Sequence, residues 1–365
     1  YVKIMKKTVL FIFTFIFSLL TNAQFSGNGF YRVQNSGTLR YLTVVDNRAS
    51  VNVATTEPDL AAILPIRKFE RIVGNPASVI YIYHAGGNNY SLRAQNVDSY
   101  DIMGIYLNLR KLDDGTYYAW ATARGLTKYL FDENSGRDDG WLDTKGEETN
   151  KKWNIIPLNS SSDNYFAAVP EFELNGYYYS TMYSSFPYKA SSDGIKMYYV
   201  SLLTNNIAVL KEVEDNFVPA ASPVIIQCAS ADYANNRLDV LETGGSTIVN
   251  NCLNGVYFNN GNGKHMNRVA YDSNTMRILG KTSDGSLGFI TADIDYLPAN
   301  KAYLTVPAGS AKEIKLITEE EYETGIDDIR ISGGDNNVYY DLSGRRVESP
   351  RNGVYVSANG KKICK

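Results

Sequence analysis

Short stretches of alternating apolar and polar residues recur along the chain. Residues 105–110 alternate in this way, and Tyr31 and Val33 alternate with Arg32 and Gln34. A period of two is typical of a β-strand with one buried face. Patterns typical of a helix are confined to residues 56–64 and 318–322. Because aromatic residues are enriched in strands, the 28 tyrosines strengthen the prediction of an all-β chain.

Residues 28–160 repeat one pattern three times. In each unit a strand that contains a tyrosine is followed by a turn and then by a second tyrosine. The pairs are Tyr31 with Tyr41, Tyr81 with Tyr90, and Tyr118 with Tyr129. A single hairpin is too small to bury its apolar face. We therefore expect the three hairpins to pack together and close a barrel.

Two segments of this region resemble the ricin-type β-trefoil family. Residues 29–35, followed by a turn and Arg40-Tyr41-Leu42, look like the opening of a ricin-type repeat, and residues 152–157 look like a closing strand. The family's Gln-x-Trp signature is absent, and Lys151-Lys152-Trp153 stands in its place. The resemblance implies a β-trefoil-like domain over residues 24–160 and a role in binding sugars.

A second repeat follows the predicted barrel. Pro219-Ala220 and Pro298-Ala299 each introduce an apolar stretch, and the two steps are 79 residues apart. Proline fixes its own φ and cannot donate to a central ladder, so each step predicts a turn before a strand. We expect two related β-sandwich-like modules, at residues 161–248 and 249–320.

The C-terminal region combines a linker with a small hairpin unit. Residues 321–337 are acidic and then rich in Gly and Asn, as in a linker, and Asn359-Gly360 between short strands in residues 338–365 indicates a hairpin. This tail is similar to the C-terminal sorting domains of type IX secreted proteins of the Bacteroidetes kind. The resemblance implies a partner in the outer-membrane secretion machinery, followed by surface attachment or release.

The N-terminal region has the pattern of a signal peptide. Lys6 and Lys7 precede an apolar run over residues 9–20, which ends at Thr21-Asn22-Ala23. This order is typical of a leader cleaved between Ala23 and Gln24. The run is shorter than a membrane span requires, so we expect no span in the mature chain. The predicted location is extracellular or on the outer-membrane surface, with the periplasm as the alternative.

Net charge and the content of cysteine and histidine limit which partners and cofactors we expect. The chain has a net charge of −3 and a pI near 5.6, and removal of residues 1–23 makes it more acidic, which argues against nucleic acid as a partner. Cys228 and Cys252 are expected to be buried thiols, with a disulfide between them as the alternative. Only two histidines are present and no Gly-x-Ser-x-Gly motif occurs. These observations favour a protein without a cofactor.

One loop contains the candidate ligand contacts. Residues 132–140 are rich in acidic and small residues, with a solvated turn as the favoured interpretation and a calcium site as the alternative. Trp141 follows directly. Aromatic faces stack on sugar rings while carboxylates bind hydroxyls, so Trp141, Asp138 and Asp139 are the predicted glycan contacts. Trp120, in a predicted strand, is a further candidate.

Three functions are consistent with this sequence. The trefoil resemblance, the excess of tyrosine and the missing catalytic motifs favour a non-catalytic glycan-binding or adhesive protein, with a carbohydrate or cell-surface glycan as partner. A secreted carbohydrate-active hydrolase needs only two carboxylates, and the 39 acidic residues leave that alternative open. The third function is a structural component of the cell surface.

Overall fold

A computed structural model describes most of the chain between residues 25 and 324, together with the strands of the tail. The described residues are 25, 27–43, 69–96, 107–123, 125–132, 140–143, 149–204, 206–256, 268–324, 339–340, 346–347, 354–357 and 362–364. Nearly all regular structure in them is strand, which confirms the all-β prediction. The short helix α1 (Glu319–Thr324) lies where a helix is predicted, and residues 56–64 are outside the described part. Among the described residues, no helix is long and apolar enough to cross a bilayer.

Six strands near the N-terminus pair in a closed ring. The ring runs β1 (Gly29–Asn35), β2 (Ile80–Gly86), β3 (Asn89–Ala94), β4 (Leu107–Lys111), β5 (Tyr117–Ala123), β8 (Lys152–Pro157) and back to β1. Two further strands, β6 (Leu126–Asp132) and β7 (Gly140–Asp143), extend from β5. Buried side chains form the core of this N-terminal barrel, and one of them, Trp153, donates from Nε1 to the Leu130 carbonyl at 2.9 Å.

The predicted hairpin units occupy this barrel. The second and third units are the hairpins β2–β3 and β5–β6, and in the first unit Gln34 of β1 bridges to Tyr41. The first tyrosine of each unit is buried and the second is half-buried. β6, the second strand of the third unit, lies outside the closed ring, and β4 and β8 complete that ring, so the three hairpins alone do not form it. The trefoil family stays a prediction.

Two sets of strands follow, and their order in the sheet is the same. The first module has β11 (Tyr177–Met182), β12 (Tyr188–Ala190), β13 (Ile195–Thr204), β14 (Ile207–Glu212), β15 (Phe217–Val218) and β16 (Val224–Cys228). The second has β18 (Leu253–Gly255), β19 (Arg268–Ala270), β20 (Met276–Lys281), β21 (Leu287–Ile290), β22 (Tyr296–Pro298) and β23 (Ala302–Thr305). The order β11-β16-β13-β14 in one equals β18-β23-β20-β21 in the other, and β12–β15 corresponds to β19–β22.

The registers of the two sets also agree. Tyr198 pairs with Ile225, and Arg277 pairs with Leu304, each residue 79 positions later. After each Pro-Ala step, one residue adopts a left-handed φ, 56° at Ala221 and 65° at Asn300. The two modules are therefore structural duplicates, in which the repeated Pro-Ala step marks one equivalent turn.

A single strand joins the duplicates into one sheet. β24 (Glu313–Thr318) pairs in parallel with β14 and antiparallel with β21. With β10 (Phe172–Leu174) at one edge and β18 at the other, the sheet has ten strands. One apolar cluster, which includes Val200, Ile225, Phe289 and Leu304, contains residues of both modules. The predicted modules are thus continuous in both sheet and core.

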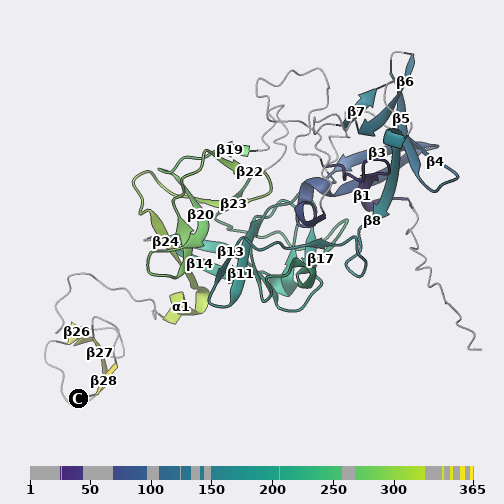
Figure 1. Cartoon of the computed structure of the whole chain (residues 1–365). Helices are drawn as coiled ribbons and strands as arrows, with labels where there is room; N and C mark the ends of the chain where they lie inside the picture. Colours follow the sequence, from purple (N-terminus) through teal and green to yellow (C-terminus); the bar gives the residue numbers. More distant parts are fainter. Residues whose placement is uncertain are drawn as a thin grey trace, which may run out of the picture.

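The N-terminal barrel also shares a core with the first module. Phe30 of the barrel packs against Phe186, with ring centroids 5.7 Å apart. Arg32 is fully buried, and its guanidinium donates to the carbonyls of Ile72 and Val73 in the barrel and to that of Tyr165, which precedes β9 (Phe166–Ala167). β9 and β17 (Arg237–Val240) belong to a small sheet with β12 and β15. Figure 1 shows the barrel strands at one end of this body and β20 and β24 toward the other.

The tail contains the predicted short strands. β25 (Tyr339–Tyr340), β26 (Arg346–Val347), β27 (Val354–Ser357) and β28 (Lys362–Cys364) form a sheet in the order β26-β25-β27-β28. β27 and β28 pair antiparallel on either side of Asn359-Gly360, as a hairpin requires.

Candidate functional site

The predicted loop site lies mostly outside the described residues. Asp138 and Asp139 fall in the gap between β6 and β7, and Ala23 and Gln24 precede the described part. Trp141 lies in β7, where its backbone pairs with Phe131. Trp120 is half-buried in β5, opposite Asn108 on one side and Tyr129 on the other. A glycan contact at the loop therefore stays a prediction.

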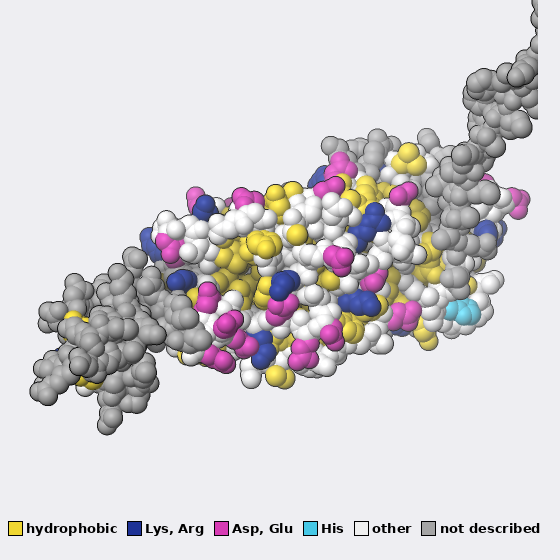
Figure 2. Space-filling view, turned by 90° about the horizontal axis from the view of Figure 1, so that it is seen from below, with side chains coloured by type: hydrophobic (Ala, Val, Ile, Leu, Met, Phe, Trp, Pro, Cys, Tyr) yellow, Lys and Arg dark blue, Asp and Glu magenta, His cyan; other side chains and the backbone are white. Residues whose placement is uncertain are grey.

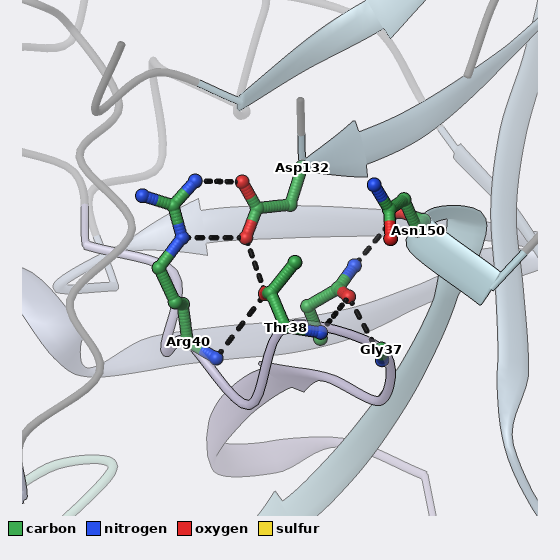
Figure 3. A network of polar contacts seen from close by, with 6 residues as sticks. Gly37, Thr38, Arg40, Asp132 and Asn150 are labelled. Carbon is green, nitrogen blue, oxygen red and sulfur yellow. Dashed lines mark hydrogen bonds and ion pairs between the residues drawn. The ribbon is translucent and has the colours of Figure 1, made fainter. Parts of the chain in front are cut away.

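Asp132, at the start of this loop, is bound within the barrel. Its carboxylate forms an ion pair with Arg40 and accepts hydrogen bonds from Arg40 Nε at 2.8 Å and from the Thr38 hydroxyl. Asn35 supports the same turn, because its Oδ1 accepts from the Gly37 and Thr38 amides (Figure 3). A fully buried carboxylate held in this way serves the barrel's own packing and not a solvent-facing calcium site.

Metal and thiol chemistry have little basis in the described residues. Among them, no group of three or more His, Cys, Asp or Glu side chains is placed to hold a metal ion. Cys228 is a buried free thiol and Cys252 a half-buried one, so the two are not joined. Burial raises the pKa of Cys228 to about 12, which keeps this thiol protonated and unreactive at neutral pH.

Aromatic side chains gather on one face of the first module. Residues paired directly across antiparallel strands point to the same face of the sheet. One such row runs Phe172, Tyr179, Gln227 and Lys196 across β10, β11, β16 and β13. The next row holds Tyr198 and Glu212, and Tyr177 stands two residues before Tyr179 on the same face. We call this set the tyrosine platform: Phe172, Tyr177, Tyr179, Lys196, Tyr198, Glu212 and Gln227.

Contacts between neighbours fix the rings of the tyrosine platform. Phe172 and Tyr179 are stacked, with centroids 5.8 Å apart and planes inclined by 24°. The Tyr198 hydroxyl donates to Gln227 Oε1 at 3.0 Å, and Lys196 Nζ lies 3.1 Å from Glu212 Oε2. Phe172, Tyr179 and Tyr198 pack with one edge against the core shared by the two modules. The rings are therefore held in place before any ligand arrives.

The platform remains open on its outer side. Tyr177 is 47% exposed, and Phe172, Tyr179 and Tyr198 are half-buried. Burial raises the pKa of Tyr198 to about 12, and the nearby Glu212 adds to the shift. Burial also raises the pKa of Tyr179. Both hydroxyls are thus protonated at neutral pH and can donate hydrogen bonds.

The duplicated module shows that the fold does not require these residues. The counterparts of Tyr198, Gln227 and Lys196, each 79 positions later, are Arg277, Val306 and Thr275. The guanidinium of Arg277 is buried and donates to main-chain carbonyls, including that of Ala311 at 2.9 Å. The same strand order therefore forms without the aromatic face.

The chemistry of the tyrosine platform suits a polyhydroxylated ligand. Aromatic rings offer apolar faces, while an amide, a carboxylate and an ammonium group at their edge can bind hydroxyls. Figure 2 shows acidic and basic side chains interspersed over the face that it presents. Such a mixed surface does not form the single-sign field that attracts a highly charged polymer.

Sequence reasoning missed this face for a physical reason. The signal was visible, because Tyr177-Tyr178-Tyr179 and Tyr198-Tyr199 are runs of tyrosine. Each run places neighbours on opposite faces of the sheet, and only the pairing across β11, β16 and β13 shows which tyrosines lie side by side.

Compared with models of protein families, with curated proteins and with solved structures, the chain has no match.

Proposed function

We propose that this chain is a secreted or surface-exposed, non-catalytic glycan-binding or adhesive protein that contacts its ligand through the tyrosine platform. The single observation that supports the proposal is the partly exposed, prepositioned aromatic face of the first module. It combines Tyr177, Tyr179 and Tyr198 with hydrogen-bonding groups at their edge. The duplicated module, with the same fold, lacks it.

The shape of the site indicates the kind of glycan. The rings lie in a row across neighbouring strands, and a row of contacts complements an extended sugar chain better than its end. Each ring adds area at little cost in conformational entropy, because Tyr has only two side-chain torsions. The platform therefore favours internal segments of a polysaccharide, bound through several rings at once.

The proposal includes the cellular location of the protein. The predicted leader over residues 1–23 and the tail's similarity to sorting domains support export and passage through the outer-membrane secretion machinery. Surface attachment or release places the platform where extracellular polysaccharides are available. The periplasm is the alternative destination.

The test measures binding of the mature chain to a glycan array and to insoluble polysaccharides. We expect Tyr177→Ala and Tyr198→Ala each to weaken binding about tenfold, which corresponds to roughly 1.4 kcal/mol for a lost stacking contact. Tyr322→Ala is the matched control, since Tyr322 is 43% exposed on α1, and it should bind as wild type.

Three outcomes would contradict the proposal. The first is an absence of binding to any glycan. The second is binding that the platform variants leave unchanged; a loss confined to Trp141→Ala would move the site to the loop before β7. The third is release of soluble reducing sugar from a bound polysaccharide, which would indicate the hydrolase instead.

A structural role on the cell surface is the second candidate. The observation in its favour is continuity, since the N-terminal barrel shares a core with the first module and β24 joins both modules in one sheet. A stiff body of this kind suits a surface subunit. Sedimentation of the purified chain separates the candidates, because a subunit should assemble with rising concentration and a soluble binder should not.

A further inference from the structure

A second concave site lies where the barrel and the two modules meet. Its walls are residues 70–71 and 74–76 of the barrel, Val169 with residues 180–182 of the first module, and residues 298–301 of the second. The volume of this open cleft is about 270 Å³. We call it the junction cleft. Ligand sites occur preferentially at such boundaries between domains.

The walls of the junction cleft are rigid. At Gly74 a Cβ atom would lie 2.5 Å from Val169 Cγ2, so the absence of a side chain lets the barrel segment lie directly on the first module. Four hydrogen bonds to Gln95 and Tyr183 hold Asn300. Its side chain forms two with the Gln95 amide and donates one to the Tyr183 carbonyl, while its own carbonyl accepts one from the Tyr183 amide. The Thr181 hydroxyl accepts from the Ala302 amide at 3.2 Å.

Three polar groups of the cleft remain without a partner among the described residues. The Ser180 side chain makes no hydrogen bond there, although Ser180 is only 2% exposed. Neither the Arg71 guanidinium nor the Glu70 carboxylate forms an ion pair or a hydrogen bond with another described residue. By contrast, Lys301 at the opposite wall is paired with Glu171. All three groups line the cleft and are available to a ligand.

We infer that the junction cleft binds a small hydroxylated carboxylate, such as a single sugar-acid ring. The planar guanidinium of Arg71 matches a carboxylate in a two-point contact, which makes arginine the preferred partner for that group. Ser180 and Glu70 are then placed to hydrogen-bond ring hydroxyls. The volume lies just below the usual range for drug-sized ligands, which limits the occupant to about one ring. The site is separate from the tyrosine platform and goes beyond the proposed function.

The experiment titrates the mature chain with D-glucuronate and D-galacturonate by calorimetry, with D-glucose as the neutral comparison. We expect both acids to bind and to raise the melting temperature, because a ligand that binds only the folded state stabilises it. Glucose should bind at least about tenfold more weakly. Added salt should weaken binding of the acids, because Arg71 is exposed to solvent.

Variants assign the binding to the cleft. Arg71→Gln should weaken uronate binding about tenfold or more, and Ser180→Ala, which changes little volume, should weaken it by a smaller factor. Lys111→Gln is the matched control for loss of an exposed positive charge on β4, and it should bind as wild type. Tyr177→Ala should also leave uronate binding unchanged, which keeps this result independent of the platform.

Two results would overturn the inference. One is uronate binding no tighter than that of glucose. The other is unchanged binding in Arg71→Gln, a variant whose exposed side chain has no bond to lose in the described structure, so that a folding defect does not obscure the result.

Discussion

Two buried arginines stabilise the barrel with different partners. Arg40 is bound to the carboxylate of Asp132, whereas Arg32 donates to neutral oxygens, among them Asn164 Oδ1 at 3.0 Å and the Ser78 hydroxyl at 3.2 Å. Burial lowers the pKa of Arg32 to about 9, so it is still protonated at neutral pH. Each guanidinium connects segments far apart in the sequence.

Arg40→Met is expected to destabilise the protein strongly. The substitution leaves the Asp132 carboxylate buried without its cation, which costs about 3–5 kcal/mol. The double variant Arg40→Met with Asp132→Leu removes both charges and should lose less than Arg40→Met alone. Urea unfolding of the set measures the difference. The two residues would not be coupled if the stability lost by the double variant equalled the sum of the losses of the two single variants.

At this scale, alternation predicts more about apolar residues than about polar ones. Tyr31 and Val33 are buried inside the barrel, as the pattern indicates. Arg32, between them, is expected on the other face and is indeed there, but the first module covers that face and buries it completely. A period of two shows which residues share a face, but it does not show what another part of the chain places on that face.

The duplicated modules show how little sequence similarity an identical element requires. Val200 pairs with Leu210, and Leu279 with Phe289, at the same 79-residue offset. The Pro-Ala step can be recognised in the sequence, because proline restricts the backbone locally and so predicts a turn. The remaining strands keep only apolar character at matched positions, and many chains share such a pattern by chance.

The equivalent turn residues should respond in opposite directions to glycine. Ala221 is exposed with a left-handed φ, which an L-residue with a Cβ adopts at a cost, so Ala221→Gly should stabilise by up to about 1 kcal/mol. Asn300 has the same φ, but Asn300→Gly removes its bonds to Gln95 and the Tyr183 carbonyl. That variant should lose about 2 kcal/mol or more, because buried partners remain unsatisfied.

Urea unfolding of both glycine variants provides the measurement. Stabilisation by Asn300→Gly would show that the amide pair between barrel and second module contributes nothing. Destabilisation by Ala221→Gly would show that the left-handed turn is not strained.

For the whole molecule, the described body from residue 27 to residue 324 behaves as one packed unit. The sequence predicts separate modules, since turns and composition mark boundaries. It does not predict β24, because pairing between strands about a hundred residues apart leaves no local pattern. The hairpins β2–β3, β5–β6 and β27–β28 are predictable because their contacts are local. The closure of the barrel, in which Tyr31 pairs with Pro157, is not local, and four strands assemble the tyrosine platform.

Calorimetry should therefore show a single unfolding transition for this body. Phe30→Ala, made in the barrel, should lower the stability of the whole transition by about 3–5 kcal/mol, because Phe30 packs against Phe186 of the first module. Leu126→Ala is the control, since Leu126 is 56% exposed on the same domain. Two separate transitions, only one of them sensitive to Phe30→Ala, would contradict a shared core.

The position of β24 in the chain has a consequence for the order of folding. β14 and β21 are synthesised before β24, the strand that pairs with both of them. The pairing of Ile207 in β14 with Lys315 in β24 therefore forms only after β24 has been made. Until then each module has a strand with one unpaired side at the edge of its sheet, and the core that the two modules share is incomplete. Under the export that we propose, such a delay would favour transport in extended form, because the most stable arrangement of the duplicates needs a strand that follows both of them.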